Sequence, residues 1–273
     1  MKNLTMFCLT LEPSHLNFIR KLNYIPVGLG DKNFSKDWMS DRNGTNISQK
    51  NKNYGEYTFH YWIWKNYMEK LDGNWIGFCQ YRKFWTLQNY ENSKIDMQEL
   101  PSIVLKSVPK EYDSCDAILG KAFFINQMRP MKFLKKGFKI ILKNPKILLS
   151  KKSRNIKFHF DLMHGEDNLN KAIDLLDDNN RETFRSYVNS MQYFHPQNMF
   201  ICKSKSLLKN YYETIFPWLE KCEKIFPIEK LHGYDLTRIY GFLAERFLSY
   251  WFQKNANCKT MDITFYDIRD NIS

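Results

Sequence analysis

The sequence predicts an α/β fold, and three observations favour it. Short apolar runs alternate along the chain with longer amphipathic segments, as strands alternate with helices in this class. The length of 273 residues suits one large domain, or one domain with a helical extension. No internal repeat and no Gly/Ser-rich or Pro-rich linker divides the chain. We therefore expect a single domain over residues 1–273, interrupted by a basic segment at 121–160.

The expected strands are short apolar runs, and the expected helices are longer segments with apolar residues three or four positions apart. The strands are expected at residues 4–10, 75–79, 117–119 and 199–202. The helices are expected at residues 54–70, 167–177, 206–225 and 235–254. In the first helix one face carries an apolar stripe, which predicts a core contact: Tyr54, Tyr57, Tyr61, Trp64 and Met68.

Polar residues follow the strand expected at 75–79, where the chain reads Gln80-Tyr81-Arg82-Lys83. Open α/β sheets place ligands at the carboxyl ends of their strands, so this position is a candidate ligand site. Arg82 and Lys83 can neutralise phosphate oxygens, Arg82 through a bidentate fork. The alternative is an ordinary solvated strand end.

The helix expected at 235–254 has one broad apolar face, and the opposite face carries Arg238, Gly241, Glu245 and Ser249. This opposite face either contacts solvent or is a second contact face that leaves room for a ligand. A glycine inside a helix costs about 1 kcal/mol relative to alanine, which favours the second interpretation.

Composition excludes several classes of protein. A hydrophobic fraction of 43% and an aromatic fraction of 16% are too high for a disordered chain. No apolar run approaches the roughly 20 residues needed to span a bilayer, and the N-terminal residues lack a signal-peptide pattern. The six cysteines are scattered without a C-x-x-C pair, so we expect reduced thiols in a cytoplasmic protein.

The net charge of +12 comes from a single segment. Residues 117–160 contain twelve Lys and Arg and no acidic residue, whereas the rest of the chain holds 29 of each sign. Within residues 117–160, the pattern at 131–149 predicts a helix with a narrow basic face beside a broad apolar face. Such a pattern is typical of helices that lie on an anionic membrane. The basic face comprises Lys132, Lys135, Lys136, Lys139, Lys143 and Lys146.

Two alternatives remain for this segment. It could be a core-packing helix whose lysines face water. It could also bind nucleic acid, but apolar bulk rather than polar reading groups surrounds the lysines, so we expect no nucleic-acid partner. Pro145 should end or kink the helix, and Gly137 weakens its middle.

Several segments, taken together and in order, carry a resemblance to a known family. They are residues 24–30 (YIPVGLG), 44–51 (GTNISQKN), 54–56 (YGE), 61–66 (YWIWKN), 75–84 (WIGFCQYRKF), 164–167 (HGED), 195–201 (HPQNMFI) and 238–246 (RIYGFLAER). In this ordered set the chain resembles the bacterial polysaccharide-biosynthesis glycosyltransferases that share a domain of unknown function numbered 4422. The resembling segments cover most of the chain outside roughly residues 85–160.

The resemblance implies a GT-A-like, Rossmann-related glycosyltransferase with an inserted basic amphipathic segment. Its implied reaction transfers a hexose, with galactose and galactofuranose as candidates, from a nucleotide sugar, with UDP as the expected nucleotide. The implied acceptor is a lipid-linked capsule or lipopolysaccharide glycan. Such an enzyme is expected in the cytoplasm, peripheral on the inner face of the inner membrane. The sequence departs from the family where Gln80 replaces the usual His and Gly55 the usual Cys, which puts any role for that imidazole in doubt.

Glycosyl transfer needs positive charge for the departing diphosphate and a base for the acceptor hydroxyl. We expect the charge from Arg82 with Lys83 or Arg238. The base candidates are Asp41, Glu56, Asp235 and, raised above these by the motif match, His164, Asp167 and Glu245. Asp167 could instead cap a helix, and Glu245 could pair with Arg238. For nucleotide or sugar hydroxyls and rings we expect Asn46, Ser48, Asn51, Tyr81 and Asn198.

The sequence assigns no cofactor. Many GT-A enzymes hold a divalent metal with an Asp-x-Asp motif after a central strand, and this motif is absent after the strand expected at 75–79, so dependence on Mn or Mg stays open. Asp113 and Asp116 are the acidic residues in a related spacing. The missing His and the missing motif favour the runner-up interpretation, a non-catalytic peripheral membrane protein that retains the glycosyltransferase fold.

Overall fold

The computed structural model describes residues 2–71, 75–90, 95–128, 142 and 150–266. The chain divides into two compact units. The first comprises residues 1–121, 198–213 and 252–273, and the second comprises residues 122–197 and 214–251. The prediction of one domain with an insertion at 121–160 stays a prediction, and the six lysines of the expected basic face all lie outside the described residues.

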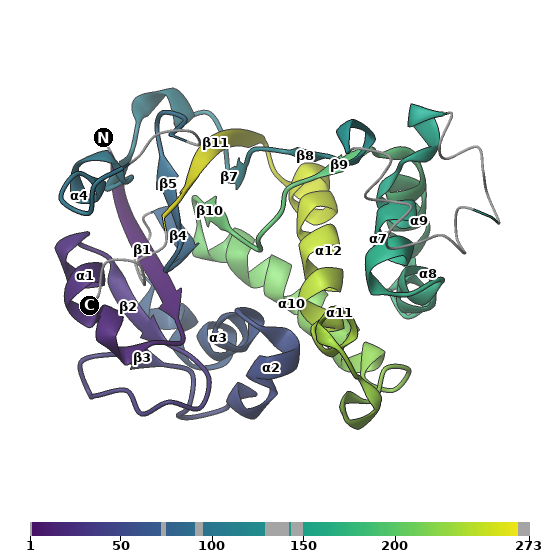
Figure 1. The fold of residues 1–273 in the computed structure, drawn as a ribbon, viewed down its shortest axis with the longest axis horizontal. Helices are drawn as coiled ribbons and strands as arrows, with labels where there is room; N and C mark the ends of the chain where they lie inside the picture. The colour runs from purple at the N-terminus through teal and green to yellow at the C-terminus, as the bar shows by residue number, and fades with distance from the viewer. Residues whose placement is uncertain (1, 72–74, 91–94, 129–141, 143–149, 267–273) are drawn as a thin grey trace. The chain divides into compact units, whose positions relative to one another are not determined.

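A nine-stranded mixed sheet forms the first unit (Figure 1). Its strands are β1 (Lys2–Thr10), β2 (Ile25–Gly28), β3 (Met39–Ser40), β4 (Trp75–Gln80), β5 (Lys83–Thr86), β6 (Ser107–Val108), β7 (Ala117–Gly120), β10 (Phe200–Cys202) and β11 (Cys258–Phe265). The strand order is β10-β7-β11-β5-β4-β1-β2-β3, and β6 pairs with β1. Strand β10 also pairs with β4. This sheet confirms the α/β class.

Strand β1 is parallel to β2 and β4, and its first residues pair antiparallel with β6. Its side chains alternate between two buried layers, which explains why the strand is apolar on both faces. Phe7 contacts Phe59 of α3 (Tyr57–Trp62), with ring centroids 5.5 Å apart. Cys8 belongs instead to a core cluster with Phe18 of α1 (Leu16–Lys21). The sheet therefore lies between helical layers, and two shorter helices, α2 (Asn51–Tyr54) and α4 (Leu100–Ile103), complete the unit.

The helix expected at 54–70 is broken. Gly55 adopts φ 59° and ψ −131°, a conformation that L side chains avoid, and it separates α2 from α3. The turn after α3, Ile63–Tyr67, is π-helical. Both changes shift the register of the expected apolar stripe, so Tyr61 and Trp64 are only half-buried while Phe59 and Ile63 are buried. The prediction that one stripe from Tyr54 to Met68 faces the core is wrong in this respect.

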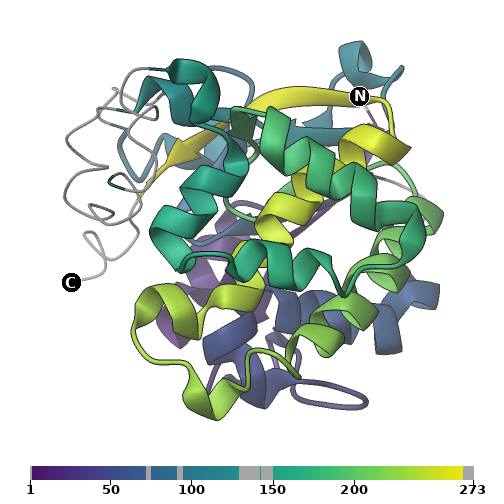
Figure 2. The ribbon, with the colours of Figure 1, turned by 90° about the vertical axis from the view of Figure 1, so that its right-hand side faces the viewer.

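The second unit is mainly helical. It contains an antiparallel pair of short strands, β8 (Phe123–Phe124) and β9 (Tyr193–Phe194), and the helices α7 (Ile156–His164), α8 (Asn168–Ile173), α9 (Asp178–Ser190) and α11 (Tyr234–Thr237). Helices α7, α8 and α9 contact one another and form the teal group in Figure 2. The boundary between the units falls within α10 (Lys205–Cys222) and α12 (Ile239–Asn255).

The helix starts follow local capping. Asn155 accepts a hydrogen bond from the Phe158 backbone N–H at 2.8 Å, and α7 begins at Ile156. Asp177 accepts from the Asn180 backbone N–H at 3.1 Å, so residue 177 begins α9 rather than ending the helix expected at 167–177. The helix expected at 235–254 is interrupted at Arg238, between α11 and α12.

Helix α12 is buried on nearly every side. Gly241 and Ser249, on the face opposite to the apolar stripe, are both buried, and the Glu245 side chain is 13% exposed. This face of the helix is therefore a second contact face rather than a solvent face.

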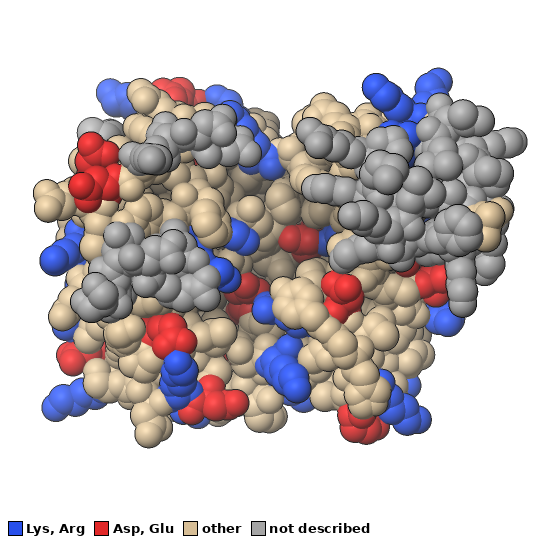
Figure 3. All heavy atoms as spheres, viewed as in Figure 1, with Lys and Arg blue, Asp and Glu red and all other residues tan. Residues whose placement is uncertain are grey.

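All six cysteines are free thiols, and five of them are buried. None of the helices that the structure describes is long and apolar enough to cross a bilayer. In the view of Figure 3, Lys and Arg side chains are interspersed with Asp and Glu over the described surface.

Candidate functional site

The first candidate region is the carboxyl edge of the parallel strands in the first unit. Strands β1, β2 and β4 end at Thr10, Gly28 and Gln80, and the loops that follow converge. Gly30 has φ 75°, and a Cβ at this position would lie 2.9 Å from the Leu11 side chain and 3.7 Å from Asn51 Oδ1. Loops from three parts of the chain thus meet where open α/β sheets bind ligands.

Tyr81 and Arg82 form the two-residue turn between β4 and the antiparallel β5, in which Gln80 pairs with Lys83. The Arg82 guanidinium lies 4.9 Å from the Tyr81 ring centroid. That ring stacks on His15 at 5.0 Å, and His15 Nδ1 forms a 2.8 Å hydrogen bond with Thr10 Oγ1. The half-buried Arg82 side chain therefore packs on Tyr81, and the stacking on His15 and the hydrogen bond of His15 to Thr10 hold that ring in place. Strand β5 begins at Lys83.

Gln80 occupies the position at which the motif usually has His. Its Nε2 donates a 2.7 Å hydrogen bond to Glu56 Oε1, which links the end of β4 to the start of α3. An amide can donate this bond as an imidazole N–H can, but it cannot accept a proton in turn. Gln80 can thus make the hydrogen bond to Glu56 that an imidazole could make, but it cannot transfer a proton.

The polar side chains of the loop at 41–48 largely hold the loop itself. Asn46 Oδ1 accepts hydrogen bonds from both the backbone N–H and the hydroxyl of Ser48, at 3.2 and 2.8 Å. Asn51 Nδ2 donates to Gly55 O and to Thr58 Oγ1. These contacts are the turn-forming role that Asn and Ser commonly have. The contacts do not test nucleotide binding by Asn46, Ser48 and Asn51, which stays a proposal.

Asp41 is completely buried at the start of this loop. Neither carboxylate oxygen has a hydrogen-bond partner among the residues that the structure describes. Burial raises the pKa of the Asp41 carboxyl, and the nearby Thr58 hydroxyl and Arg42 charge lower it to a smaller extent. Asp41 therefore has a stronger tendency to hold a proton than an exposed aspartate.

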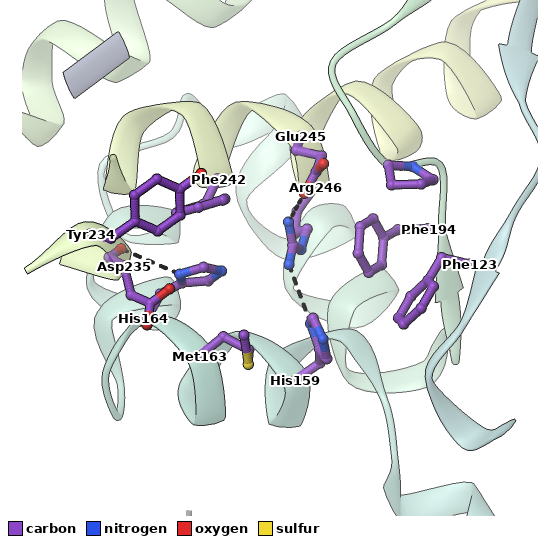
Figure 4. Close-up of a pocket in the computed structure, with 11 residues that line it drawn as sticks. Phe123, His159, Met163, His164, Phe194, Tyr234, Asp235, Phe242, Glu245 and Arg246 are labelled. Carbon is purple, nitrogen blue, oxygen red and sulfur yellow. Dashed lines mark hydrogen bonds and ion pairs between the residues drawn. The ribbon is translucent and has the colours of Figure 1, made fainter. Parts of the chain in front are cut away.

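The second candidate region is a pocket of about 290 Å³ that lies entirely within the second unit (Figure 4). Residues from β8, α7, the end of β9, α11 and α12 surround it. Aromatic side chains dominate its lining, and its ionisable groups are His159, His164, Asp235, Glu245 and Arg246. Two of the predicted catalytic residues, His164 and Glu245, are thus brought together in one cavity.

A buried ion pair forms one wall of the pocket. The Arg246 guanidinium is 2% exposed and pairs through Nη1 with Glu245 Oε2. Its Nη2 lies 3.2 Å from His159 Nδ1, and its Cζ lies 4.0 Å from the Phe194 ring centroid. Because an arginine only donates hydrogen bonds, His159 Nδ1 is the acceptor. Glu245 also accepts from the Gln197 backbone N–H, so each of its oxygens has a partner.

Arg246 was not assigned a role from the sequence, although it belongs to the motif at 238–246. The sequence feature that could have identified Arg246 is a charged residue inside an otherwise apolar helix. The alternative pairing of Glu245 with Arg238 is not the one observed, because Arg246 occupies the Glu245 carboxylate. Arg238 lies at the break between α11 and α12, with its Cζ 5.8 Å from the Tyr234 ring centroid.

His164 ends α7 and is 3% exposed. Its ring stacks on Phe242, with centroids 3.9 Å apart, and its Nδ1 lies 3.3 Å from the Asp235 backbone oxygen. Since a carbonyl oxygen only accepts, Nδ1 is the donor in this contact, and in the neutral ring the lone pair is then on Nε2. The ring is thereby oriented for a proton-accepting role at Nε2.

Asp167 is exposed and is not among the residues that line the pocket. It precedes α8 in the left-handed conformation, with φ 66°, and its Oδ1 accepts from Asn170 Nδ2 at 2.9 Å. Its backbone N–H donates to Asp161 Oδ1 at 3.1 Å. Asp167 thus stands at the N-cap position of α8, but its side chain makes no capping hydrogen bond to the backbone.

Asn198 also has an unusual backbone. Gln197 and Asn198 are consecutive non-glycine residues with φ 84° and 54°. Such residues cost of order 1–3 kcal/mol each and concentrate at functional sites. Asn198 is 8% exposed and lies two residues before the start of β10 at Phe200.

Among the residues that the structure describes, no three or more His, Cys, Asp or Glu side chains are grouped as metal ligands. Asp116 Oδ2 accepts a hydrogen bond from the Asn257 backbone N–H at 3.0 Å, and the Asp113 backbone oxygen accepts from Lys203. Asp116 through its side chain and Asp113 through its backbone oxygen thus connect segments that are distant in the chain.

Comparison with known proteins places the chain in a family. The model of the domain of unknown function 4422 matches residues 11–256, so the chain belongs to that family, as the motifs predicted. The apo structure of WbbM, a bifunctional glycosyltransferase, is similar to the chain with a TM-score of 0.73 and 20% sequence identity. The similarity covers 97% of this chain and 45% of WbbM, so the chain spans less than half of that protein. No curated protein matches the chain.

Proposed function

We propose that this protein is a glycosyltransferase that transfers a hexose from a nucleotide sugar to a glycan acceptor. The observation that carries the proposal is the fold, since nearly the whole chain is similar in structure to part of a glycosyltransferase. The converging loops at the sheet edge and the pocket of the second unit supply two regions where substrates can bind. UDP is the proposed nucleotide, and galactose and galactofuranose are the candidate sugars.

The proposed reaction breaks the bond between the anomeric carbon and the diphosphate oxygen, and the bonding electrons leave with the nucleoside diphosphate. The acceptor hydroxyl oxygen forms the new bond to the anomeric carbon and loses its proton to a base. We assign the base to His164, because Nε2 carries the lone pair. Glu245 holds Arg246 instead, because both of its oxygens are bonded.

Arg82 and Lys83 are proposed to bind the donor diphosphate. The guanidinium of Arg82 stands on the turn that follows β4, and charge-assisted hydrogen bonds to phosphate are among the stronger ones in proteins. Arg238 remains a proposed contributor from the second unit. Tyr81, Asn46, Ser48, Asn51 and Asn198 stay proposed contacts of the nucleotide or sugar.

Binding of the donor can be tested by thermal shift and calorimetry with UDP and a panel of nucleotide sugars, with and without manganese or magnesium. Stabilisation by a nucleotide sugar, followed by release of free nucleotide when acceptor is added, is the expected result. Loss of one charge-assisted contact in Arg82→Ala should weaken UDP binding about tenfold or more. Arg20→Ala is a matched control, because Arg20 is paired with Asp37 on an exposed surface. No binding of any nucleotide would contradict the proposal, and binding without turnover would support the non-catalytic alternative.

We further propose that the basic segment holds the enzyme at an anionic membrane surface, beside a lipid-linked acceptor of capsule or lipopolysaccharide synthesis. The support is the sequence pattern alone: six lysines share one face of an otherwise apolar stretch. Flotation with anionic vesicles tests this. Replacing Lys132, Lys135, Lys136 and Lys139 with Glu should abolish flotation, and unchanged flotation would refute the proposal.

A further inference from the structure

Two polar side chains from one face of α12 hold the backbone of residues 195–197. Glu245 and Ser249 are four residues apart, so they lie on the same face of the helix. Ser249 Oγ accepts a 2.8 Å hydrogen bond from the His195 backbone N–H, and Glu245 Oε1 accepts one from the Gln197 backbone N–H. The polar face of α12 therefore binds a stretch of backbone.

The Glu245 carboxylate is itself held in place. Its second oxygen pairs with Nη1 of the buried Arg246, and Arg246 Nη2 lies 3.2 Å from His159 Nδ1. The bond that Glu245 accepts from Gln197 has an ionised acceptor, and such bonds are roughly twice as strong as those between neutral groups. Glu245 therefore restrains the Gln197 peptide firmly.

The restrained backbone runs directly into a strained turn. Gln197 and Asn198 have φ 84° and 54°. Glycine adopts such angles at no cost and Asn tolerates them, whereas they are uncommon for Gln. Residues other than glycine keep this conformation only where surrounding contacts impose it. The hydrogen bond from Gln197 to Glu245 is such a contact, and it acts at the residue where the strain begins.

The turn leads into a strand that brings Asn198 toward the carboxyl end of β4. Strand β10 is antiparallel to β4, and Ile201 lies opposite Gly77. Residues that precede β10 therefore lie toward the carboxyl end of β4, and the same register continued to residue 198 leads to Gln80. At this end of β4 stands the turn with Arg82, to which donor binding is assigned above.

We propose that Glu245 is a positioning residue for the donor substrate. It holds the Gln197 peptide and thereby fixes the backbone of the turn that presents the Asn198 side chain. The Asn198 amide, which can both donate and accept hydrogen bonds, then contacts the nucleotide sugar. The inference rests on the proposed function and makes it more specific, because Glu245 supports donor binding without touching the donor or transferring a proton.

Calorimetric titration of the full chain with UDP and with UDP-galactose tests the proposal. Asn198→Ala should weaken binding about fivefold, as expected for the loss of one hydrogen bond. Glu245→Met combined with Arg246→Met leaves no lone buried charge and should weaken binding to a similar extent. Adding Asn198→Ala to these two substitutions should cause no further loss, because the contact of Asn198 is already lost.

Two further variants separate positioning from a general loss of structure. Gln197→Gly, added to Glu245→Met and Arg246→Met, should recover most of the lost affinity, since glycine adopts the required φ without support. Lys209→Met combined with Glu213→Met is the matched control. It also replaces an ion pair with two methionines, but this pair is exposed on α10, so binding should equal that of the wild type.

The inference is overturned in three cases, with folding checked by circular dichroism. The first is wild-type affinity in the Glu245→Met and Arg246→Met variant. The second is a combined variant in which the losses multiply with that of Asn198→Ala. The third is a failure of Gln197→Gly to recover any affinity.

Hydrogen exchange of the wild-type chain is a test that needs no variant. Saturating UDP-galactose should slow exchange at residues 197–199, and unchanged exchange there would overturn the inference. A wild-type chain that binds neither UDP nor UDP-galactose would overturn the proposed donor together with the inference. Where the wild type does bind, the contrary outcomes above overturn the positioning role alone.

Discussion

Arg246 shows how one residue can link the core of the second unit to its pocket. The guanidinium is buried, stacks on Phe194 and contacts both Glu245 and His159. Burial lowers its pKa, and the Glu245 charge opposes this. A guanidinium nevertheless stays protonated in proteins, so Glu245 has a permanent counter-ion. The pair shapes the pocket wall without leaving a net charge there.

Arg246→Ala should destabilise the protein by about 3–5 kcal/mol, because it leaves the Glu245 carboxylate without its counter-ion in a largely buried place. The free energy of unfolding from urea denaturation measures this. Arg185→Ala is the control, since Arg185 pairs with exposed Asp174 and Glu182, and surface pairs contribute about 0–1 kcal/mol. Equal losses in the free energy of unfolding would show that the Arg246–Glu245 pair contributes no more to stability than a surface pair.

At the scale of elements, the loop at 41–48 is fixed by the helix that follows it. Asn66, in the π-helical turn, accepts from the Thr45 N–H and donates to the Thr45 oxygen, at 3.0 and 2.8 Å. Trp62 Nε1 donates to the Asn43 oxygen. A π-helical turn places side chains where a regular helix would not, and such turns are frequent at functional sites. The turn therefore positions the loop that carries Asn46 and Ser48.

Gly44→Ala should release this loop. Gly44 has φ 60°, and a Cβ there would lie 2.2 Å from Asn66 Oδ1, so the substitution adds a clash to the backbone strain. Gly233→Ala is the matched control, because Gly233 has φ 77° but no heavy atom within 4 Å of the added Cβ. The control should lose about 1 kcal/mol from the backbone alone. We expect Gly44→Ala to lose more, and to speed hydrogen exchange at residues 41–48. Equal losses and unchanged exchange would contradict the positioning role.

The four expected strands match the structure more closely than the expected helices do. All four expected strands are present, because a buried strand is marked by its own apolar residues. The long β11 was missed, since its polar residues Lys259, Thr260 and Asp262 interrupt the apolar pattern. The helix expected at 54–70 failed at Gly55, where the break depends on a positive φ that periodicity does not reveal.

At the scale of the whole molecule, the core of the first unit contains a buried polar cluster. His60 is completely buried, and its Nδ1 forms a 2.7 Å hydrogen bond with Tyr212 Oη. Burial lowers the pKa of His60 to about 3. The folded protein keeps this ring neutral, whereas the unfolded chain binds a proton below a pH of about 6.5. Protons therefore favour the unfolded state between these two values.

The free energy of unfolding should fall as the pH is lowered from about 6.5 toward 3, by up to about 1.4 kcal/mol per pH unit from this ring. Urea denaturation at pH 7 and pH 5 measures the effect. His60→Gln should be less stable than wild type at pH 7, and the difference should shrink at pH 5. His232→Gln, at an exposed position, is the control and should keep the wild-type slope. An identical pH dependence in His60→Gln and wild type would refute this role.

The sequence by itself determined the α/β class, the central strands, the family and the position of the excess charge. Each of these is encoded in local pattern: apolar runs mark buried strands, and charge and motif order are read along the chain. It also identified His164 and Glu245 as candidates. Only the tertiary structure decided that Glu245 pairs with Arg246, that Asp167 and Asn46 have structural contacts, and that His164 and Glu245 line one pocket. The pocket joins residues far apart in the chain, so it exists only once separate elements have packed together. The pairs formed by Glu245, Asp167 and Asn46 are close in sequence, but side-chain conformation and burial, which packing sets, decided which partner each residue takes.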